Sequence, residues 1–262
     1  MRSGLKRNPI DKYYTNENVV QFCYDLIKQT LKIQKSDVIV EPSAGNGAWI
    51  PTIKQLSNNH RFYDIKPEHP DIIKQNFLTL KENLSDSYLI GNPPFGRKSS
   101  TAIKFIKHAA FLKAKVIAFI LPNSFKKQSF RKSFPLNYHL VLQKNIPEYG
   151  FIYDNKPYNV PSVFQIWERR DYDRKQTTKL YPKAWYKFVK KEDCDISIKR
   201  VGFGIGKVKK CSIDDNVNSH WFIKLFKDVD IAALNKIKFN RTQNVGALSI
   251  SKQDIIRKYN KL

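Results

Sequence analysis

The sequence is poor in acidic residues, with 23 Asp and Glu against 47 Lys and Arg in 262 residues. It contains no apolar run of about eighteen residues, so it predicts no membrane-spanning helix. The segment MRSGLKRNPI lacks the apolar stretch of a secretory signal. Hydrophobic residues nevertheless make up 41% of the chain, enough to bury a core and to exclude a disordered tail. We expect a cytoplasmic or nuclear protein, neither secreted nor membrane-bound.

Cysteine is scarce as well. Cys23, Cys194 and Cys211 form no C-x-x-C pair, so neither a disulfide framework nor a zinc site is predicted. A reducing compartment, in which these thiols stay free, is the expectation. The five histidines show no ligand spacing, and no metal is expected.

The net charge of +24 predicts a polyanionic partner, because clustered Lys and Arg are typical of nucleic-acid-binding proteins. Residues 87–147 contain no acid, and eleven of these 61 residues are basic. The rest of the charge is spread along the chain: residues 1–170 carry 26 basic and 13 acidic groups, and residues 171–262 carry 21 and 10. Both parts of the chain are therefore strongly basic.

Helical and strand patterns alternate over the first 170 residues, which predicts a doubly wound α/β sheet. Apolar residues at steps of three and four predict a helix that begins near Thr15 or Asn16 and continues to Leu31. The later elements are expected in this order: strand 37–40, helix 50–56, strand 61–64, an element at 77–80, strand 87–90, helix 102–112, strand 116–121 and strand 163–167.

A polar tract, DYDRKQTTK, follows Arg170 and predicts a linker. We expect one domain over residues 1–172 and a smaller, strand-rich region over 173–262, with strands at 196–201 and 220–226. The alternative is that the later strands complete the first sheet. The glycines of 202–206 favour a hairpin or sharp bend over a phosphate-binding loop. The aromatic residues of 220–222 favour a core strand over a base-stacking site.

The first candidate site is a strand that ends at Glu41 and enters the loop Pro42-Ser43-Ala44-Gly45-Asn46-Gly47. Glycines let a backbone approach a ligand closely. A dinucleotide fingerprint would need a third glycine where Ile50 lies, and an acid at the end of the strand would repel a pyrophosphate. Glu41 instead suits a cationic ligand.

The second candidate is Asp64, which ends the next strand nineteen residues after Gly45. A carboxylate at this spacing can accept hydrogen bonds from ribose hydroxyls, although an Asp that caps the following turn is equally common. Ile65 can pack on an adenine ring. Together with Glu41, these residues describe a site for a positively charged nucleoside, as in S-adenosylmethionine.

The third candidate is Asn92-Pro93-Pro94-Phe95, directly after an apolar strand. The two prolines fix the backbone and remove two N–H donors, which leaves carbonyl acceptors where α/β sheets bind their ligands. An exocyclic amine becomes nucleophilic when both of its protons are accepted in hydrogen bonds. The Asn92 side-chain oxygen and the Pro93 carbonyl can accept them, while Phe95 stacks on the base.

With these motifs the sequence resembles the S-adenosylmethionine-dependent adenine-N6 methyltransferases over residues 11–168. Asp11-Lys12-Tyr13-Tyr14-Thr15 resembles their N-terminal cofactor motif, and 92–95 resembles their catalytic tetrapeptide. Asn76 departs from the family, which usually has Asp there to accept from the adenine amine. The resemblance implies a Rossmann-like class I methyltransferase sheet and these cofactor contacts: Tyr14, Thr15, Glu41, Pro42, Ser43, Gly45, Gly47, Asp64, Ile65, Asn76, Phe77 and Asn92.

It also implies direct methyl transfer to an adenine amine in DNA, with the base flipped or unpaired and with Asn92, Pro93, Pro94 and Phe95 as catalytic residues. A homodimer or a methyltransferase of several different subunits would fit. The acid-free tract then supplies phosphate contacts, for which the candidates are Arg97, Lys98, Lys126, Lys127, Arg131 and Lys132.

Other functions stay open. RNA adenosine-N6 and guanine-N2 methyltransferases share such tetrapeptides. A nucleic-acid-binding subunit without activity is another alternative, although its tetrapeptide or cofactor loop would usually be degraded. Residues 173–262 are expected to recognise the substrate or to bind a partner, with these candidate residues: Trp185, Tyr186, Arg200, Lys207, Lys209 and Lys210.

Overall fold

The computed structural model describes residues 13–175, 178–239 and 249–262. The chain divides into two compact units, residues 1–175 (unit 1) and 176–262 (unit 2). The division lies three residues beyond the position expected from the polar tract. Asp11 and Lys12 of the expected N-terminal motif lie outside the described residues.

Unit 1 contains a seven-stranded sheet in the order β4-β3-β2-β5-β6-β10-β7. Strands β2 to β6 run parallel, and β10 is antiparallel to both of its neighbours. This mixed α/β sheet confirms the predicted Rossmann-like class I fold. Its strands are β2 (Val38–Glu41), β3 (Asn59–Asp64), β4 (Ile73–Lys74), β5 (Tyr88–Gly91), β6 (Val116–Pro122), β7 (Tyr138–Asn145) and β10 (Ser162–Arg169).

The parallel register places three loop starts at one edge of the sheet. Glu41 at the end of β2 is paired with Phe62 of β3, and Val40 is paired with Leu89 of β5. The carboxyl ends of β2, β3 and β5 therefore lie side by side. Ligands of open α/β sheets bind at such an edge.

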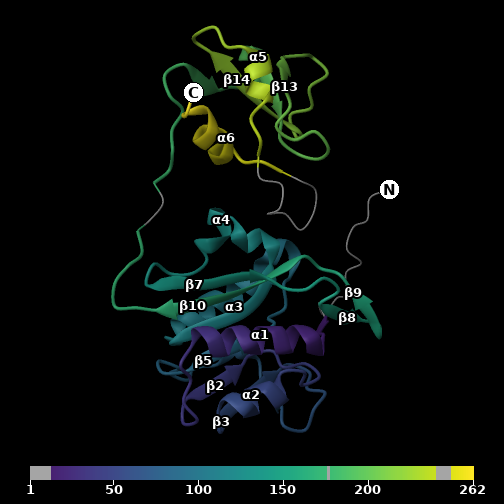
Figure 1. Ribbon diagram of the computed structural model, residues 1–262, viewed down its shortest axis with the longest axis vertical. Helices are drawn as coiled ribbons and strands as arrows, with labels where there is room; N and C mark the ends of the chain where they lie inside the picture. Colours follow the sequence, from purple (N-terminus) through teal and green to yellow (C-terminus); the bar gives the residue numbers. More distant parts are fainter. Residues whose placement is uncertain (1–12, 176–177, 240–248) are drawn as a thin grey trace. The chain divides into compact units, whose positions relative to one another are not determined.

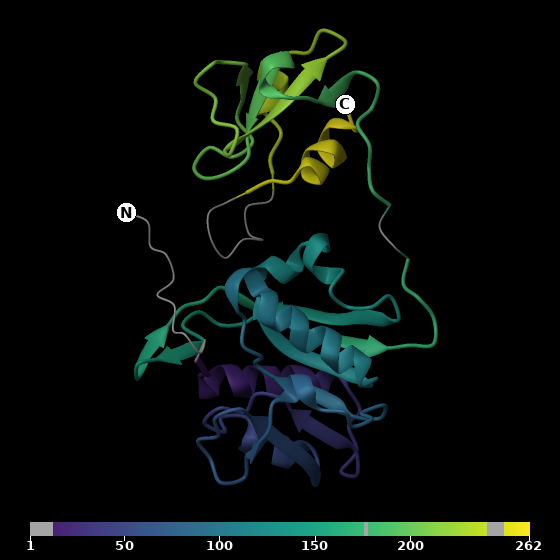
Figure 2. The ribbon, with the colours of Figure 1, turned by 180° about the vertical axis from the view of Figure 1, so that it is seen from behind.

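Helices cover both faces of this sheet (Figures 1 and 2). Helices α1 (Glu17–Thr30) and α2 (Ile50–Leu56) lie on one face, and α3 (Ser100–Phe111) lies on the other. The side chains of β6 are buried throughout, and alternate ones such as Ile117 and Phe119 join the α3 core. Short helical turns complete the unit: η1 (Phe77–Thr79), η2 (Arg97–Ser99), η3 (Asn123–Lys126) and α4 (Gln128–Arg131).

A small second sheet in unit 1 was not expected from the sequence. It joins β1 (Tyr14–Thr15) to the hairpin of β8 (Phe151–Tyr153) and β9 (Lys156–Tyr158). Thr15 pairs with Phe151, and the ring of Tyr13 stacks on that of Tyr158 with centroids 5.4 Å apart. The N-terminal motif is therefore fixed by residues that follow it by more than a hundred positions.

Unit 2 has its own antiparallel sheet in the order β11-β14-β12-β13, so the later strands do not extend the first sheet. Trp185, Tyr186 and Tyr259 lie in its core. The glycines of 202–206 form the expected hairpin loop between β12 and β13. The elements are β11 (Tyr186–Phe188), η4 (Lys191–Asp193), β12 (Ile196–Lys199), β13 (Val208–Lys210), β14 (His220–Leu225), α5 (Ile231–Asn235) and α6 (Lys252–Tyr259).

The cysteines differ from expectation. Cys194 and Cys211 form a disulfide in unit 2, with Cα atoms 6.1 Å apart, whereas the sequence predicted free thiols. The two residues lie next to the paired strands β12 and β13, and this pairing brings them together across a separation of seventeen residues. Sequence spacing alone did not reveal the pairing. Cys23 is a free, buried thiol, and burial raises its pKa.

In the part of the chain that the structure describes, no helix is both long enough and apolar enough to cross a bilayer. The same residues contain no group of three His, Cys, Asp or Glu side chains suited to a metal ion.

Candidate active site

A cavity of about 290 Å³ opens at the carboxyl ends of β2, β3 and β5. All four residues of the tetrapeptide line it, and so do all of the expected cofactor residues except Gly47. Four separate loops and strand β1 thus contribute to one pocket. Further residues of its wall were not singled out as contacts from the sequence: Tyr13, Ala44, Asn46, Ala48, Trp49, Leu78, Thr101, Phe105 and Phe151.

The glycine loop is held against β3 by two hydrogen bonds. The Ala44 N–H donates to the Tyr63 carbonyl at 2.9 Å, and the Gly45 N–H donates to Asp64 Oδ2 at 2.8 Å. Gly45 has φ = 54°, a left-handed conformation that favours glycine. The loop backbone can therefore lie directly on the cavity.

Gly47 has a structural role in this loop. Its φ is 86°, and a Cβ atom there would lie 2.8 Å from Ile50 Cδ1 and 3.2 Å from the His69 side chain. Both the backbone conformation and the packing require glycine. Gly47 thus shapes the turn into α2 and does not line the cavity, in contrast to the expected cofactor contact.

Glu41 is a buried acid, and its position disfavours the charged form of the carboxyl. Its side chain is 1% exposed, and Oε2 has no hydrogen-bond partner. Burial raises the pKa of this carboxyl well above its ordinary value, and the neighbouring Asp64 raises it further. A cationic group of a ligand in the cavity would relieve both effects.

Asp64 both caps its own turn and fixes the glycine loop. Oδ1 accepts from the Lys66 N–H at 2.8 Å, while Oδ2 accepts from Gly45. The two interpretations left open by the sequence are therefore compatible, because each carboxylate oxygen can accept a second bond. Beside it, Ile65 exposes 59% of its surface, an apolar group available to a ligand ring.

Asn76 caps η1. Its Oδ1 accepts from the Leu78 N–H at 3.0 Å, and the side chain is exposed at the cavity wall. Phe77, by contrast, is buried and packs against Phe105. The amide at position 76 therefore has a local structural function, which an aspartate could also fulfil, so the cap does not explain why asparagine stands here.

Hydrogen bonds with Tyr13 and Ser43 hold Asn92 in one orientation. Asn92 Nδ2 donates to the Tyr13 carbonyl at 3.3 Å, and Ser43 Oγ donates to the Asn92 carbonyl at 3.2 Å. Asn92 Oδ1 is buried and has no hydrogen-bond partner. A buried acceptor without a donor is costly, so this oxygen is ready to accept from a ligand.

Phe95 meets Phe151 of β8 edge to face, with ring centroids 6.0 Å apart and an interplanar angle of 86°. Phe151 is fully buried, and both rings line the cavity. The sequence pattern did not single out Phe151, because it lies in a short strand far from the motifs. Only its pairing with Thr15 reveals that it belongs to the site.

The side chains that line the cavity fit S-adenosylmethionine. Glu41 supplies an unpaired buried carboxylate oxygen for a cation, Asp64 supplies carboxylate acceptors for hydroxyls, and Ile65 supplies an apolar surface for a ring. Asn92 Oδ1 remains as the acceptor for a second ligand. The cavity thus combines features for a cationic nucleoside and for an amine.

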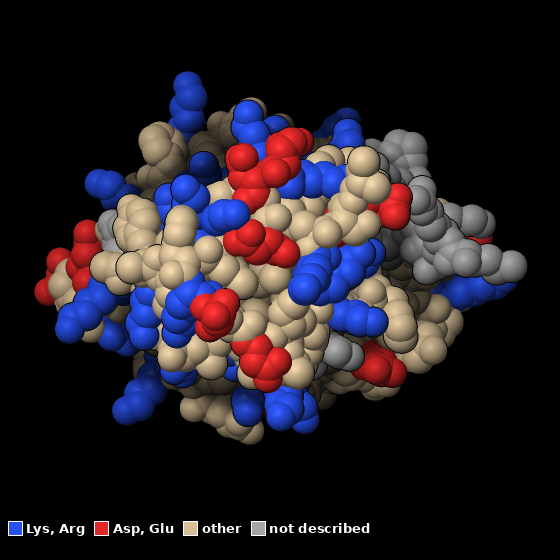
Figure 3. Space-filling view, turned by 90° about the horizontal axis from the view of Figure 1, so that it is seen from above, with Lys and Arg blue, Asp and Glu red and all other residues tan. Residues whose placement is uncertain are grey.

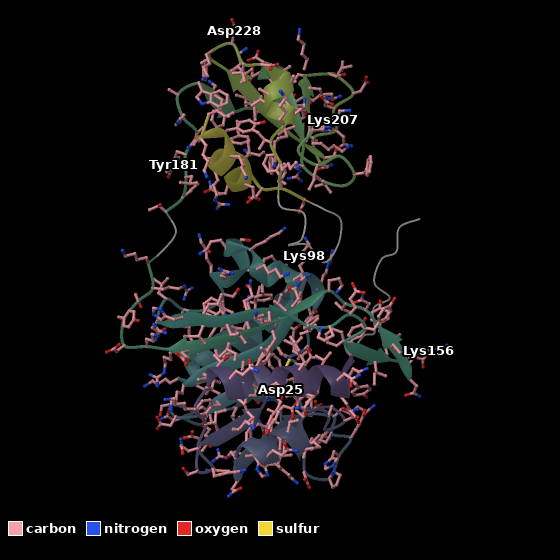
Figure 4. All side chains as sticks on the ribbon, viewed as in Figure 1. Asp25, Lys98, Lys156, Tyr181, Lys207 and Asp228 are labelled. Atoms are coloured by element: carbon pink, nitrogen blue, oxygen red, sulfur yellow. A yellow bond between two sulfur atoms is a disulfide. The ribbon has the colours of Figure 1, made fainter. Side chains whose placement is uncertain are left out.

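The basic candidates beyond the tetrapeptide differ in exposure. Arg97, Lys98 and Lys132 are exposed, and Figure 4 shows Lys98 at the surface of unit 1. Lys126 and Arg131 are half-buried, and burial lowers the pKa of each. Arg131 also donates to Gln143 Oε1 at 2.9 Å and so belongs to the framework of β7.

Lys127 is half-buried as well and lies at the cap of α4. On the face drawn in Figure 3, Lys and Arg side chains are interspersed with Asp and Glu side chains. The charge of the chain therefore does not by itself mark one binding surface on that face.

The sequence matches a family described as EDM2 methyltransferase-like domain over residues 32–180. Two curated relatives, the Type II methyltransferases M.HincII and M.HindII of Haemophilus influenzae, are each 29% identical to the chain over 96 residues. That stretch covers 35% of this chain and 18% of each relative. The chain thus spans less than a fifth of the length of the curated relatives it matches.

Two solved structures are similar in fold. The 23S rRNA methyltransferase ErmE has a TM-score of 0.46 and 14% identity, over 60% of this chain and 44% of that one. An rRNA methylase from Streptococcus thermophilus has a TM-score of 0.37 and 11% identity, over 57% and 96%. Because the family match spans more than half of the sequence, the chain belongs to the EDM2 methyltransferase-like domain family, and its cofactor is S-adenosylmethionine.

Proposed function

We propose that the protein is a methyltransferase that transfers a methyl group to the N6 amine of adenine in DNA. The observation that carries the proposal is Asn92 Oδ1, a buried acceptor without a partner in the same cavity as the unpaired carboxylate of Glu41. When bound, S-adenosylmethionine supplies the methyl group in electrophilic form. The residues of the chain hold and orient the two reactants.

Asn92 and Pro93 act on the target amine. Asn92 Oδ1 accepts a hydrogen bond from one N–H of the amine and the Pro93 carbonyl accepts one from the other, which localises the lone pair on the nitrogen. The proton that the amine loses on methylation passes to water. Positioning of this kind accounts for up to roughly 7–11 kcal/mol of a barrier. The bond from Asn92 Nδ2 to the Tyr13 carbonyl keeps Oδ1 directed at the amine.

Phe95 and Phe151 hold the base. The two rings meet edge to face. Phe95 stacks on the base, and the buried Phe151 closes the side of the pocket. A base inside a duplex cannot reach this cavity, so a duplex substrate is flipped at a cost of a few kcal/mol. The exposed Arg97 and Lys98, which follow Phe95 after Gly96, are placed to bind the adjacent phosphates.

DNA is proposed over RNA on two grounds. The loop has the form E-P-S-A-G-x-G and the N-terminal motif contains Tyr14-Thr15, both of which resemble DNA methyltransferases. The partial similarity to two Type II methyltransferases supports the same choice. Thr15 lines the cavity, and its strand pairs with the strand that carries Phe151.

Methyl transfer from tritium-labelled cofactor to DNA, RNA and protein acceptors tests the proposal, with nucleoside analysis of the product. We expect label in N6-methyladenine of DNA. Label in N6-methyladenosine of RNA would reject DNA as the substrate, and label in N2-methylguanine would reject adenine as the target. If the protein binds the cofactor but labels no acceptor, alone or with candidate partner subunits, the catalytic proposal is wrong.

A further inference from the structure

We propose that unit 2 binds a single strand of nucleic acid through a basic, aromatic groove around Trp221. The choice of nucleic acid as ligand rests on the proposed function, but the site belongs to unit 2 and takes no part in methyl transfer. The groove has a volume of about 290 Å³ and is lined by residues of β14, η4 and α6 that include Trp221, Lys190, Glu192 and Lys252.

Trp221 is the centre of this surface and is held in a fixed orientation. It is half-buried on β14, and its Nε1–H donates to the Ile250 carbonyl at 3.1 Å. The guanidinium of Arg200 lies 4.4 Å from the centre of the Trp221 ring. The Lys252 ammonium lies 5.0 Å from the same ring and 4.8 Å from the Phe188 ring.

These contacts order cations before any ligand arrives. Arg200 donates from Nε to the Asn218 carbonyl at 3.2 Å, which fixes the plane of its guanidinium. Further N–H groups in that plane can donate to phosphate oxygens, or the plane itself can stack on a base. Ordering in the free protein lowers the entropy lost on binding. The arrangement therefore suits a polyanion better than an isolated flexible lysine does.

The charge of the groove also favours an anion. Lys190 is exposed at its wall, and the neighbouring Lys191 donates to the Ile213 carbonyl. Glu192 is the one acid among the lining residues described. Lys190, Lys252 and the adjacent Arg200 outweigh it.

The loop that follows Arg200 adds an exposed aromatic side chain. Phe203 is 101% exposed and lies between Gly202 and Gly204, whose φ angles are 84° and 75°. Ile205 is buried and anchors the loop, and a Cβ atom on Gly206 would lie 2.6 Å from the Phe239 ring. The loop is therefore built to present Phe203 rather than to bury it. Figure 4 labels Lys207, which follows this loop.

This combination points to a single strand rather than a duplex. Proteins that bind single strands pair a basic groove for the backbone with aromatic rings on which successive bases stack. Unit 2 offers Lys190, Lys252 and Arg200 for phosphates and Phe203 for a base. Stacking on Phe203 needs an unpaired base with an open face.

Binding of the full-length protein to a fluorescein-labelled single strand, without cofactor, tests the proposal by fluorescence anisotropy. Phe203→Ala is expected to weaken binding roughly 5-fold or more, the loss typical of one stacked base. The double variant Lys190→Ala with Lys252→Ala should reduce the slope of log Kd against log salt by about 1.4, because each single-strand phosphate contact contributes roughly 0.7. Binding to a duplex of the same sequence should change less.

Matched controls are available in the same unit. Phe226→Ala removes another exposed phenylalanine, and Lys227→Ala removes a lysine packed on Trp185 at 5.0 Å, outside the groove. Both controls should bind like the wild type. If the groove variants bind the single strand like these controls, the inference is wrong, and equal losses for strand and duplex would overturn the single-strand assignment.

Cofactor binding and methyl transfer to a short oligonucleotide separate this inference from the proposed function. Groove variants that lose strand affinity should keep both. A wild-type protein that binds strands through the groove but transfers no methyl group would overturn the proposed activity and leave this inference in place.

Discussion

The two polar atoms of the Asn92 side-chain amide differ in their hydrogen bonding. Its Nδ2 donates to the Tyr13 carbonyl, and its buried Oδ1 has no partner. Asn92→Ala removes the acceptor for the target amine, so we expect methyl transfer to fall by roughly 10²–10³-fold or more, as for other transition-state hydrogen bonds. The cofactor dissociation constant, measured by calorimetry, should stay nearly unchanged.

Ser43→Ala is the milder control for this variant. It removes a hydrogen bond to the Asn92 backbone and leaves the side-chain amide in place. We expect a smaller loss of transfer than for Asn92→Ala. Equal losses of transfer and cofactor affinity in Asn92→Ala would mean that the residue maintains the cavity and does not act on the amine.

In the proposed site, we expect Glu41 to couple the stability of the folded protein to cofactor binding. Burial, reinforced by Asp64, raises its pKa on folding, so the folded protein holds the proton more tightly than the unfolded chain. Stability should therefore fall as the pH rises from the ordinary value of 4.5 through the raised pKa. Glu41→Gln should raise the melting temperature of the free protein at neutral pH and weaken cofactor binding roughly 10-fold or more.

Thermal unfolding with and without cofactor measures both effects, and Glu17→Gln, an exposed acid in the first turn of α1, is the control. Glu17→Gln should change neither value appreciably. A Glu41→Gln protein that melts below the wild type in the absence of cofactor would show that the carboxylate is paired in the folded state.

The sequence predicted some of these residues because their chemistry is local. Glu41 ends one apolar strand and Asn92 follows another, so an acid and an amide at those points indicate a site. The Tyr13 carbonyl and Phe151 could not be predicted in the same way. Their roles depend on the pairing of β1 with β8, and no short-range pattern specifies that pairing.

At the scale of elements, the regular parts were predictable and the small sheets were less so. Strand β6 lies within one residue of the predicted range because a buried parallel strand has a continuous apolar run. The element at 77–80 is a single helical turn, η1. The disulfide depends on the β12–β13 pairing, and so it escaped a prediction based on cysteine spacing.

Asp215 links β12 to β13 in unit 2. It is 1% exposed, accepts from Ser197 Oγ at 2.7 Å and lies 2.6 Å from Lys209 Nζ. Burial raises its pKa. Hydrogen bonds from Lys209, Ser197 and the Ser212 N–H lower the pKa by more than burial raises it, so the net result is a pKa of about 2. Asp215→Asn should reduce the free energy of unfolding by about 1.5–3 kcal/mol at neutral pH.

The sign of the pH dependence follows from the lowered pKa. The carboxylate contributes fully above 3.8, the ordinary value, and the contribution is lost as the pH falls toward 2. The difference between wild type and Asp215→Asn in urea unfolding should therefore shrink below pH 4. Asp214→Asn, an exposed neighbour, should have little effect, and a similar loss in both variants would reject the pairing as its cause.

At the scale of the whole molecule, the net charge of +24 is divided between the two units, and its distribution matters more than its sum. Arg97, Lys98 and Lys132 are exposed beyond the tetrapeptide of residues 92–95, whereas Arg131 is hydrogen-bonded to Gln143. All of these residues were equal candidates for phosphate contacts in the sequence, because charge alone does not distinguish a framework arginine from an exposed one. Arg131 would have to lose this hydrogen bond before it could contact a phosphate, whereas the exposed three would lose no such bond.

A salt titration tests whether the exposed residues Arg97, Lys98 and Lys132 contact phosphates. If the exposed three each neutralise one phosphate of duplex DNA, the triple variant Arg97→Ala, Lys98→Ala, Lys132→Ala should reduce the slope of log Kd against log salt by about 2.7, since each contact releases roughly 0.9 counterion. Lys156→Ala, an exposed lysine on the β8–β9 hairpin that Figure 4 labels, should leave the slope unchanged. A triple variant with the wild-type slope would assign these residues to the solvated surface, because each lost phosphate contact leaves its counterion on the DNA and so must reduce the slope.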